Sequence, residues 1–241
     1  MEILARHRVF DGELVYARHV SRATHTPMRF SIFTPPSKGP HPYAIWLSGL
    51  TCSDENFTVK AGAFRDAARL GLAVVAPDTS PRGEHVADDS AFDLGQGASF
   101  YVDAIRSPWA THFQMETYVT RDLIEAAEAN FPLKGARRGV LGHSMGGHGA
   151  LTLALRHPNL FASVSAFAPI AAPSRCPWGE KALCAYLGPD RALWRAYDAT
   201  ALIEDGAAKG RFDDILIDQG GADPFLKDQL KPDLLAAACA R

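Results

Sequence analysis

The segment RRGVLGHSMGGHGALTLALRHP, residues 137–158, holds a serine in a setting that suits nucleophilic catalysis. Its centre, GHSMG, matches the pattern G-x-S-x-G, with Gly142 and Gly146 two residues to either side of Ser144. An apolar run precedes the pattern and a segment suited to a helix follows it. The serine is therefore expected on a sharp turn, where side chains at the two glycine positions would collide with it. Ser144 is the predicted nucleophile; the alternative is an ordinary strand-to-helix turn with glycines for tight packing.

Hydrolases built around such a turn carry an acid after the serine and a histidine after the acid. The segment DDILIDQGGADPFL, residues 213–226, supplies two carboxylates in that order. Asp223 lies in a glycine-rich loop after an apolar run, where it can face the carboxyl edge of a parallel sheet. Asp218 lies inside the run and is the alternative, although an aspartate buried in a strand is more often structural. The predicted acid is Asp223.

The oxyanion of a tetrahedral intermediate needs backbone N–H donors. One is predicted at Met145, the residue after the serine, because the free amides of a helix N-terminus favour negative charge. The other is predicted in the loop SGLTCSDENF, residues 48–57, which offers Leu50 or Thr51. That loop can at the same time be a glycine turn before a helix.

These groups need a sheet to position them. Two early segments alternate apolar and polar residues, which predicts an antiparallel start: ELVYARHVS (13–21) and PMRFSIFTP (27–35). Later runs are short and apolar on both faces, which is typical of parallel strands covered by helices: YAIWLSG (43–49), LAVVAPD (72–78), RRGVLGHS (137–144), FASVSAFAP (161–169) and DDILIDQG (213–220).

Helical periodicity separates these runs. The predicted helices are residues 56–71, 115–132, 146–158, 176–188, 191–203 and 228–241. In the second of them Tyr118, Leu123, Ala126 and Ala127 should share one face. Strands that alternate with helices in this way indicate one open α/β sheet with helices on both faces, in a single domain over residues 1–241.

The composition argues against several classes of protein, among them those that bind nucleic acids or span membranes. The 241 residues carry a net charge of −2, which gives no reason to expect a nucleic acid or an anionic membrane as a partner. No apolar run approaches the roughly 20 residues that span a bilayer. Four cysteines without metal-ligand spacing or disulfide density, and an N-terminus without a signal peptide's apolar core, predict a cytoplasmic protein. Neither a dinucleotide motif nor a P-loop occurs, so no cofactor and no metal is predicted.

The chain resembles the S-formylglutathione hydrolase family, also called esterase D. The resemblance extends from about residue 5 to the end and rests on these segments: WLSGLTCSDENF, VVAPDTSPRGE, GASFYVDA, GHSMGGHGAL, SVSAFAPI, CPWGEKAL, YLG, YDAT and DILIDQG. It implies an α/β-hydrolase fold. It also implies a cytosolic thioesterase that cleaves S-formylglutathione to formate and glutathione in formaldehyde detoxification, together with general carboxylesterase activity.

The family's site residues fall on matching positions of this sequence. The nucleophile falls on Ser144 and the acid on Asp223, while the oxyanion donors fall on the backbone of Leu50 and Met145. Cys52 matches a cysteine near the family's active site that can confer sensitivity to thiol reagents; a small buried apolar residue is the other interpretation.

The family's triad histidine follows the acid by some thirty residues, whereas none of the nine histidines of this chain follows His157. His143 and His148 are near Ser144 in sequence, but the first should project to the other side of the turn and the second should pack locally. His85 and His112 lie in loops and do not fit the chain order. We therefore expect a chain cut short relative to the family, with a sheet edge and an apolar face left uncovered.

Three functions remain open from the sequence: a serine thioesterase and esterase, a hydrolase-fold protein that only binds a ligand or partner, and an acyltransferase to an alcohol. The small-molecule pocket is predicted to include Lys60, Trp109 or Trp178, although a loop tryptophan is more often a packing anchor. A homodimer is compatible with the sequence, which gives no oligomeric state.

Overall fold

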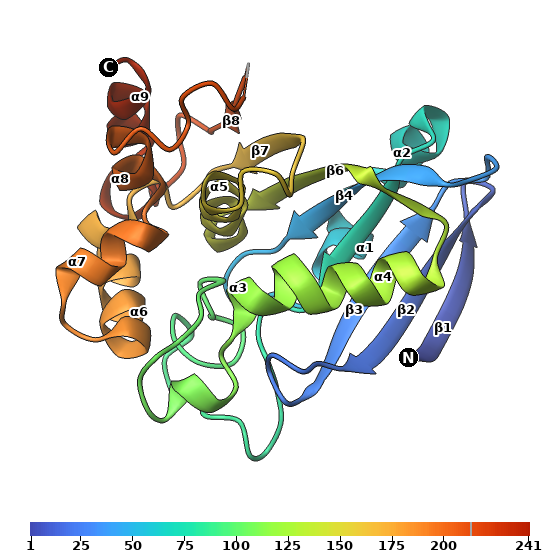
Figure 1. The fold of residues 1–241 in the computed structure, drawn as a ribbon, viewed down its shortest axis with the longest axis horizontal. Helices are drawn as coiled ribbons and strands as arrows, with labels where there is room; N and C mark the ends of the chain where they lie inside the picture. Colours follow the sequence, from blue (N-terminus) through green and yellow to red (C-terminus); the bar gives the residue numbers. More distant parts are fainter. Residues whose placement is uncertain (213) are drawn as a thin grey trace.

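The computed structural model describes residues 1–212 and 214–241. An eight-stranded sheet in the order β1-β2-β3-β5-β4-β6-β7-β8 forms its centre (Figure 1). The strands are β1 (Glu2–Val9), β2 (Gly12–Val20), β3 (Pro27–Thr34), β4 (His41–Leu47), β5 (Ala73–Pro77), β6 (Leu133–His143), β7 (Ser163–Phe167) and β8 (Leu216–Asp218). The first residue of the strand predicted at 213–220 lies outside the described residues.

The sheet has an antiparallel part and a parallel part. The pairs β1–β2, β2–β3 and β3–β5 are antiparallel, and the pairs among β4, β5, β6, β7 and β8 are all parallel. This confirms the predicted antiparallel start followed by a parallel sheet. Strand β1 was not predicted. It is an edge strand whose side chains are mostly exposed, so it carries no apolar alternation to detect.

The helices are α1 (Asn56–Lys60), α2 (Phe64–Leu70), α3 (Met115–Thr117), α4 (Leu123–Asn130), α5 (Met145–Arg156), α6 (Pro177–Leu187), α7 (Arg191–Trp194), α8 (Ala199–Glu204) and α9 (Pro232–Cys239). They follow the predicted segments, but three of these segments are broken: 56–71 between α1 and α2, 191–203 at the extended Asp198, and 228–241 at Lys231, which has φ = 50°. A π-helical turn joins α3 to α4, so this segment is continuous as predicted. The segment at 56–71 is instead two helices, and Gly71 ends the second with φ = 66°. No helix within the described residues is long and apolar enough to cross a membrane.

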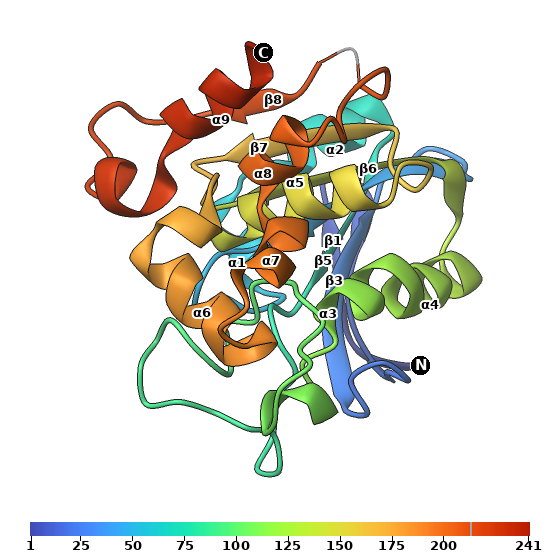
Figure 2. The ribbon, with the colours of Figure 1, turned by 60° about the vertical axis from the view of Figure 1, so that its left-hand side comes forward.

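Helices cover both faces of the sheet, but unequally (Figures 1 and 2). On one face, side chains such as Ile32 and Val75 join a large core with α4, α5 and α6. On the other, Phe33 and Val74 join a small core with α1 and α2 only. The smaller side leaves an open apolar groove of about 520 Å³, lined by residues that include Ala44, Trp46, Phe57, Leu70, Val74, Leu141 and Phe167.

Candidate active site

Ser144 is held in a strained backbone conformation between β6 and α5. Its φ of 57° and ψ of −117° are unfavourable for a residue with a side chain. The turn is fixed from both sides, because the Ser144 N–H donates to the Phe167 carbonyl at 2.9 Å and the Ser144 carbonyl accepts from His148 N–H at 3.0 Å. The turn therefore holds the serine at the carboxyl end of β6, directly before α5.

The glycines of the motif are required by close backbone contacts. A Cβ built on Gly142 would lie 2.2 Å from the Gly146 carbonyl oxygen, and one on Gly146 would lie 1.9 Å from the Leu47 carbonyl oxygen. Both distances are far below van der Waals contact, and the atoms in the way are backbone. The steric reason for the pattern G-x-S-x-G is thus present at both positions.

We expect Gly146→Ala to lower the free energy of unfolding by about 2–3 kcal/mol, because the backbone of β4 or α5 must move to admit the methyl group. The matched control is Gly220→Ala, where a Cβ meets nothing within 4 Å. Urea unfolding of both variants measures the difference. Equal stability of the two variants would show that the close approach of α5 to β4 does not constrain the turn.

Two backbone amides lie next to the serine on different elements. The Met145 amide begins α5, and the Leu50 amide lies in the loop after β4. That loop lies against the serine, since a Cβ on Gly49 would be 3.3 Å from the Ser144 Cβ. Within the described residues neither amide donates a hydrogen bond, whereas the Thr51 amide donates to the Gly97 carbonyl at 2.9 Å. Of the two predicted loop donors, the geometry therefore favours Leu50.

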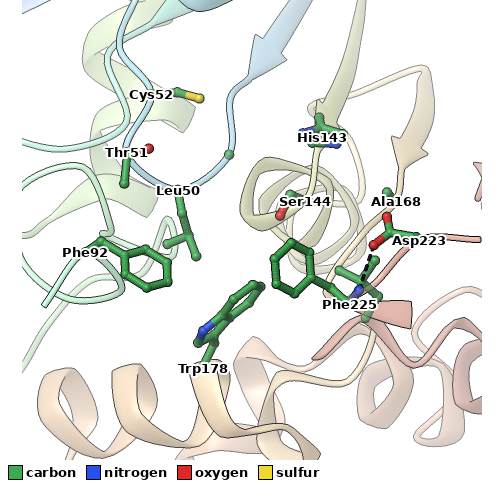
Figure 3. Close-up of a pocket in the computed structure, with 12 residues that line it drawn as sticks. Leu50, Thr51, Cys52, Phe92, His143, Ser144, Ala168, Trp178, Asp223 and Phe225 are labelled. Carbon is green, nitrogen blue, oxygen red and sulfur yellow. Dashed lines mark hydrogen bonds between the residues drawn. The ribbon is translucent and has the colours of Figure 1, made fainter. Parts of the chain in front are cut away.

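A pocket of about 250 Å³ lies directly in front of Ser144 (Figure 3). Most of its surface is apolar. It is lined by Gly49, Leu50, Thr51, Cys52, Phe92, His143, Ser144, Ala168, Trp178, Asp223, Phe225 and Leu230. The structure thus brings together the predicted serine, the predicted acid and the predicted loop donor.

The two candidate acids have different environments. Asp223 is half-buried at the pocket wall, and its Oδ1 accepts a hydrogen bond from the Phe225 N–H at 2.8 Å, which fixes the carboxylate (Figure 3). Asp218 is the exposed last residue of β8 and does not line the pocket. The expectation of a buried strand aspartate is therefore wrong for Asp218. The geometry favours Asp223.

His143 is the histidine that reaches this pocket. Partial enclosure by its surroundings lowers the pKa of the imidazole, and the negative charge of Asp223 opposes that shift. The ring is therefore neutral near pH 7. Among the described residues, no histidine is hydrogen-bonded to Ser144 or to the Asp223 carboxylate.

His148 lies in the interior and not at the pocket. It is fully buried on α5, its Nε2 lies 2.9 Å from the Phe100 carbonyl, and burial lowers its pKa to about 4. The loop histidines are also away from the pocket: His85 is exposed, and the His112 Nδ1 lies 2.8 Å from the Thr24 carbonyl. The prediction that His148 packs locally matches this placement.

Trp178 lines the pocket, and Trp109 does not. Trp178 packs against Phe92 and Phe225, with ring centroids 6.0 and 4.8 Å away. Trp109 is buried edge-on against Phe113 and Tyr186, so its assignment near the site is wrong. Trp178 begins α6 and Trp109 begins a short 3-10 turn, and no local sequence signal shows that one would line the pocket and the other would be buried in the core. The same holds for Phe92 and Phe225, which also line the pocket and stand in no recognisable motif.

Cys52 and Lys60 are both close to the loop after β4. Cys52 lines the pocket, and burial raises the pKa of its thiol, so the group is protonated near neutral pH. Lys60 lines a neighbouring cavity, not the pocket of Ser144. In the described part of the chain, no three His, Cys, Asp or Glu side chains are grouped to hold a metal ion.

Comparison with known proteins gives three concordant results. The family model Esterase, described as "Putative esterase", matches residues 21–241. The S-formylglutathione hydrolase of Paracoccus denitrificans is 53% identical over 241 residues, covering 99% of this chain and 85% of that protein. The solved structure of an S-formylglutathione hydrolase from Agrobacterium tumefaciens is 47% identical, with a TM-score of 0.96 over 99% of this chain and 86% of that one.

A more distant structure shares the fold. FphF, a fluorophosphonate-binding serine hydrolase of Staphylococcus aureus, is 18% identical with a TM-score of 0.72 over 94% of this chain and 85% of that chain. These relations confirm the α/β-hydrolase fold predicted from the sequence. With a family model that matches residues 21–241 and a relative at 53% identity, the chain belongs to the esterase family.

Proposed function

We propose that this protein is a serine hydrolase that cleaves the thioester S-formylglutathione into formate and glutathione, and simple esters by the same route. One observation carries the proposal. A strained serine adjoins two backbone amides that donate no hydrogen bond within the described residues, in one pocket with a carboxylate held by the Phe225 N–H. The two S-formylglutathione hydrolases similar to this chain supply the substrate class.

In the proposed mechanism the Ser144 Oγ attacks the thioester carbonyl. The N–H groups of Leu50 and Met145 stabilise the oxyanion, the glutathione thiolate leaves, and water then releases formate from the formyl-serine. A thiolate is a good leaving group, so the step depends less on protonation than amide cleavage does. Asp223 is placed to stabilise the positive charge of the base that takes the Ser144 proton.

The base of this mechanism is proposed to be none of the nine histidines in residues 1–241. Eight of the nine do not line the pocket. Two of these eight are hydrogen-bonded elsewhere, His148 to the Phe100 carbonyl and His157 to the Glu116 carboxylate. His143 directly precedes the nucleophile on the strained turn and makes no hydrogen bond to it. Without the base, binding and the oxyanion hole alone leave a rate about 10³–10⁴-fold above that in water.

Two further proposals concern the domain organisation and the cellular compartment. One sheet contains strands from both ends of the chain, which supports a single α/β-hydrolase domain over residues 1–241. The four cysteines are free, which supports a reducing compartment such as the cytoplasm.

Product analysis tests the proposal. Incubated with S-formylglutathione, the protein is expected to release free thiol and formate in equal amounts, and an added alcohol should not divert the formyl group. Thiol release is measured with a disulfide reagent and formate by an enzyme-coupled assay. Accumulation of a formyl ester would identify an acyltransferase. Binding of the thioester without Ser144-dependent turnover would identify a binding protein.

A further inference from the structure

The loop that carries the Leu50 amide is strained at the next residue. Thr51 has a φ of 66°, a region that residues with a side chain rarely adopt. Such strain persists only when neighbouring contacts hold it. The Leu50 amide adjoins this residue, so the same contacts determine where that amide points.

Two segments distant in sequence hold the far side of the loop. The Cys52 carbonyl accepts hydrogen bonds from the Thr79 Oγ1 at 2.5 Å and from the Arg82 Nη2 at 2.9 Å. Arg82 is itself held by the Asp78 carboxylate, at 2.9 and 3.1 Å from its Nε. The Gly97 carbonyl accepts from the Thr51 amide. These bonds fix the loop after Leu50.

Tyr101 holds the near side of the loop. Its hydroxyl donates to the Ser48 carbonyl at 2.8 Å, two residues before Leu50. Burial raises the pKa of this phenol well above its ordinary value, so the hydroxyl stays a donor over the whole working range of pH. Tyr101 itself has a φ of 52° and is fully buried, so its ring has a defined position.

The Tyr101 ring also contacts the helix that supplies the other amide. A Cβ on Gly149, in the second turn of α5, would lie 2.6 Å from the Tyr101 Cδ2, so the ring packs directly on the helix backbone. The adjacent Phe100 is tied to the same helix, since its carbonyl lies 2.9 Å from the His148 Nε2. One side chain therefore joins the loop of Leu50 to the helix of Met145.

We propose that Tyr101 is a positioning residue of the oxyanion hole, which holds the Leu50 amide at a fixed place relative to the Met145 amide. The inference rests on the proposed function, because it assumes that these amides bind the oxyanion. It predicts a specific kinetic signature: loss of the hydroxyl weakens binding of the tetrahedral state and leaves binding of the ground state unchanged.

The test is Tyr101→Phe, which keeps the ring and removes only the hydroxyl. We expect kcat for S-formylglutathione to fall about tenfold with KM within twofold, since loss of a whole oxyanion donor costs about 10²–10³-fold and here the donor is only displaced. Affinity for a trifluoromethyl ketone analogue, which forms a tetrahedral adduct with serine, should fall by a similar factor. Inhibition by the product glutathione should not change.

Tyr43→Phe is the matched control. The Tyr43 hydroxyl is also hydrogen-bonded, to Glu128 and Arg138, but it lies at the opposite end of β4 from Ser48. Its removal should lower the urea midpoint of unfolding at least as much as Tyr101→Phe does, without the kinetic signature. If Tyr101→Phe matches this control in kcat and analogue affinity while Ser144→Ala loses covalent labelling by a fluorophosphonate probe, the positioning inference is wrong and the proposed function stands. If Ser144→Ala is still labelled, the proposed function itself fails.

Discussion

The Ser144→Ala variant is expected to form no covalent adduct with a fluorophosphonate probe, while the unchanged protein gains the mass of one phosphonyl group. The reason is local, because Ser144 is the serine that combines a strained turn, a place in the pocket wall and two neighbouring amides without a hydrogen-bond partner in the described residues. Hydrolysis of S-formylglutathione by the variant should keep only what binding and the oxyanion hole supply without a nucleophile, about 10³–10⁴-fold above the rate in water. Intact-protein mass spectrometry and thiol release measure the two effects.

Ser48→Ala and Ser53→Ala are the controls, because both serines lie in the loop beside the pocket. The Ser48 Oγ accepts from the Trp46 indole N–H at 3.0 Å, and the Ser53 Oγ accepts from the Glu55 N–H at 3.3 Å. Both hydroxyls are thus engaged structurally, and both variants should still be labelled at Ser144. Labelling that persists in Ser144→Ala and disappears in either control would show that a different serine is the nucleophile.

The turn at Ser144 could be predicted from sequence because its causes are local. Gly142 and Gly146 are glycines for a steric reason that acts within five residues and one neighbouring strand. Apolar runs located the parallel strands in the same way, because a strand buried on both faces must be apolar along its length. By contrast, β1 buries little surface, and the break between α1 and α2 depends on how each helix packs on the sheet.

The walls of the pocket could not be predicted in this way. Trp109 and Trp178 both lie outside the strands, yet one is packed among aromatic rings of the core and the other faces Ser144. Phe92 and Phe225 come from segments more than 130 residues apart and meet at one tryptophan. The role of Tyr101 depends on a contact with Ser48 that only the folded chain creates. Each of these features is decided by tertiary contacts, for which one sequence has no local signal.

Imidazole added to the assay is expected to accelerate turnover of the unchanged protein by at least about tenfold, and Asp223→Asn is expected to remove most of that gain. The proposed mechanism lacks a base among the nine histidines of these residues, and a diffusible imidazole can take the Ser144 proton and carry positive charge. Asp223 would stabilise that charge. An opposite charge about 4 Å away is worth about 4 kcal/mol near a protein surface, so after solvent screening we expect a loss of roughly 10²-fold.

Asp218→Asn is the matched control, since it makes the same chemical change on a carboxylate that does not line the pocket. It should keep the imidazole-stimulated rate within twofold. Ser144→Ala measures the direct attack of imidazole on the thioester, which is subtracted from every rate. His143→Ala tests the alternative base: if it abolishes turnover and imidazole does not accelerate the unchanged protein, His143 is the base. If instead Asp218→Asn loses the stimulated rate and Asp223→Asn keeps it, the acid has been assigned to the wrong carboxylate.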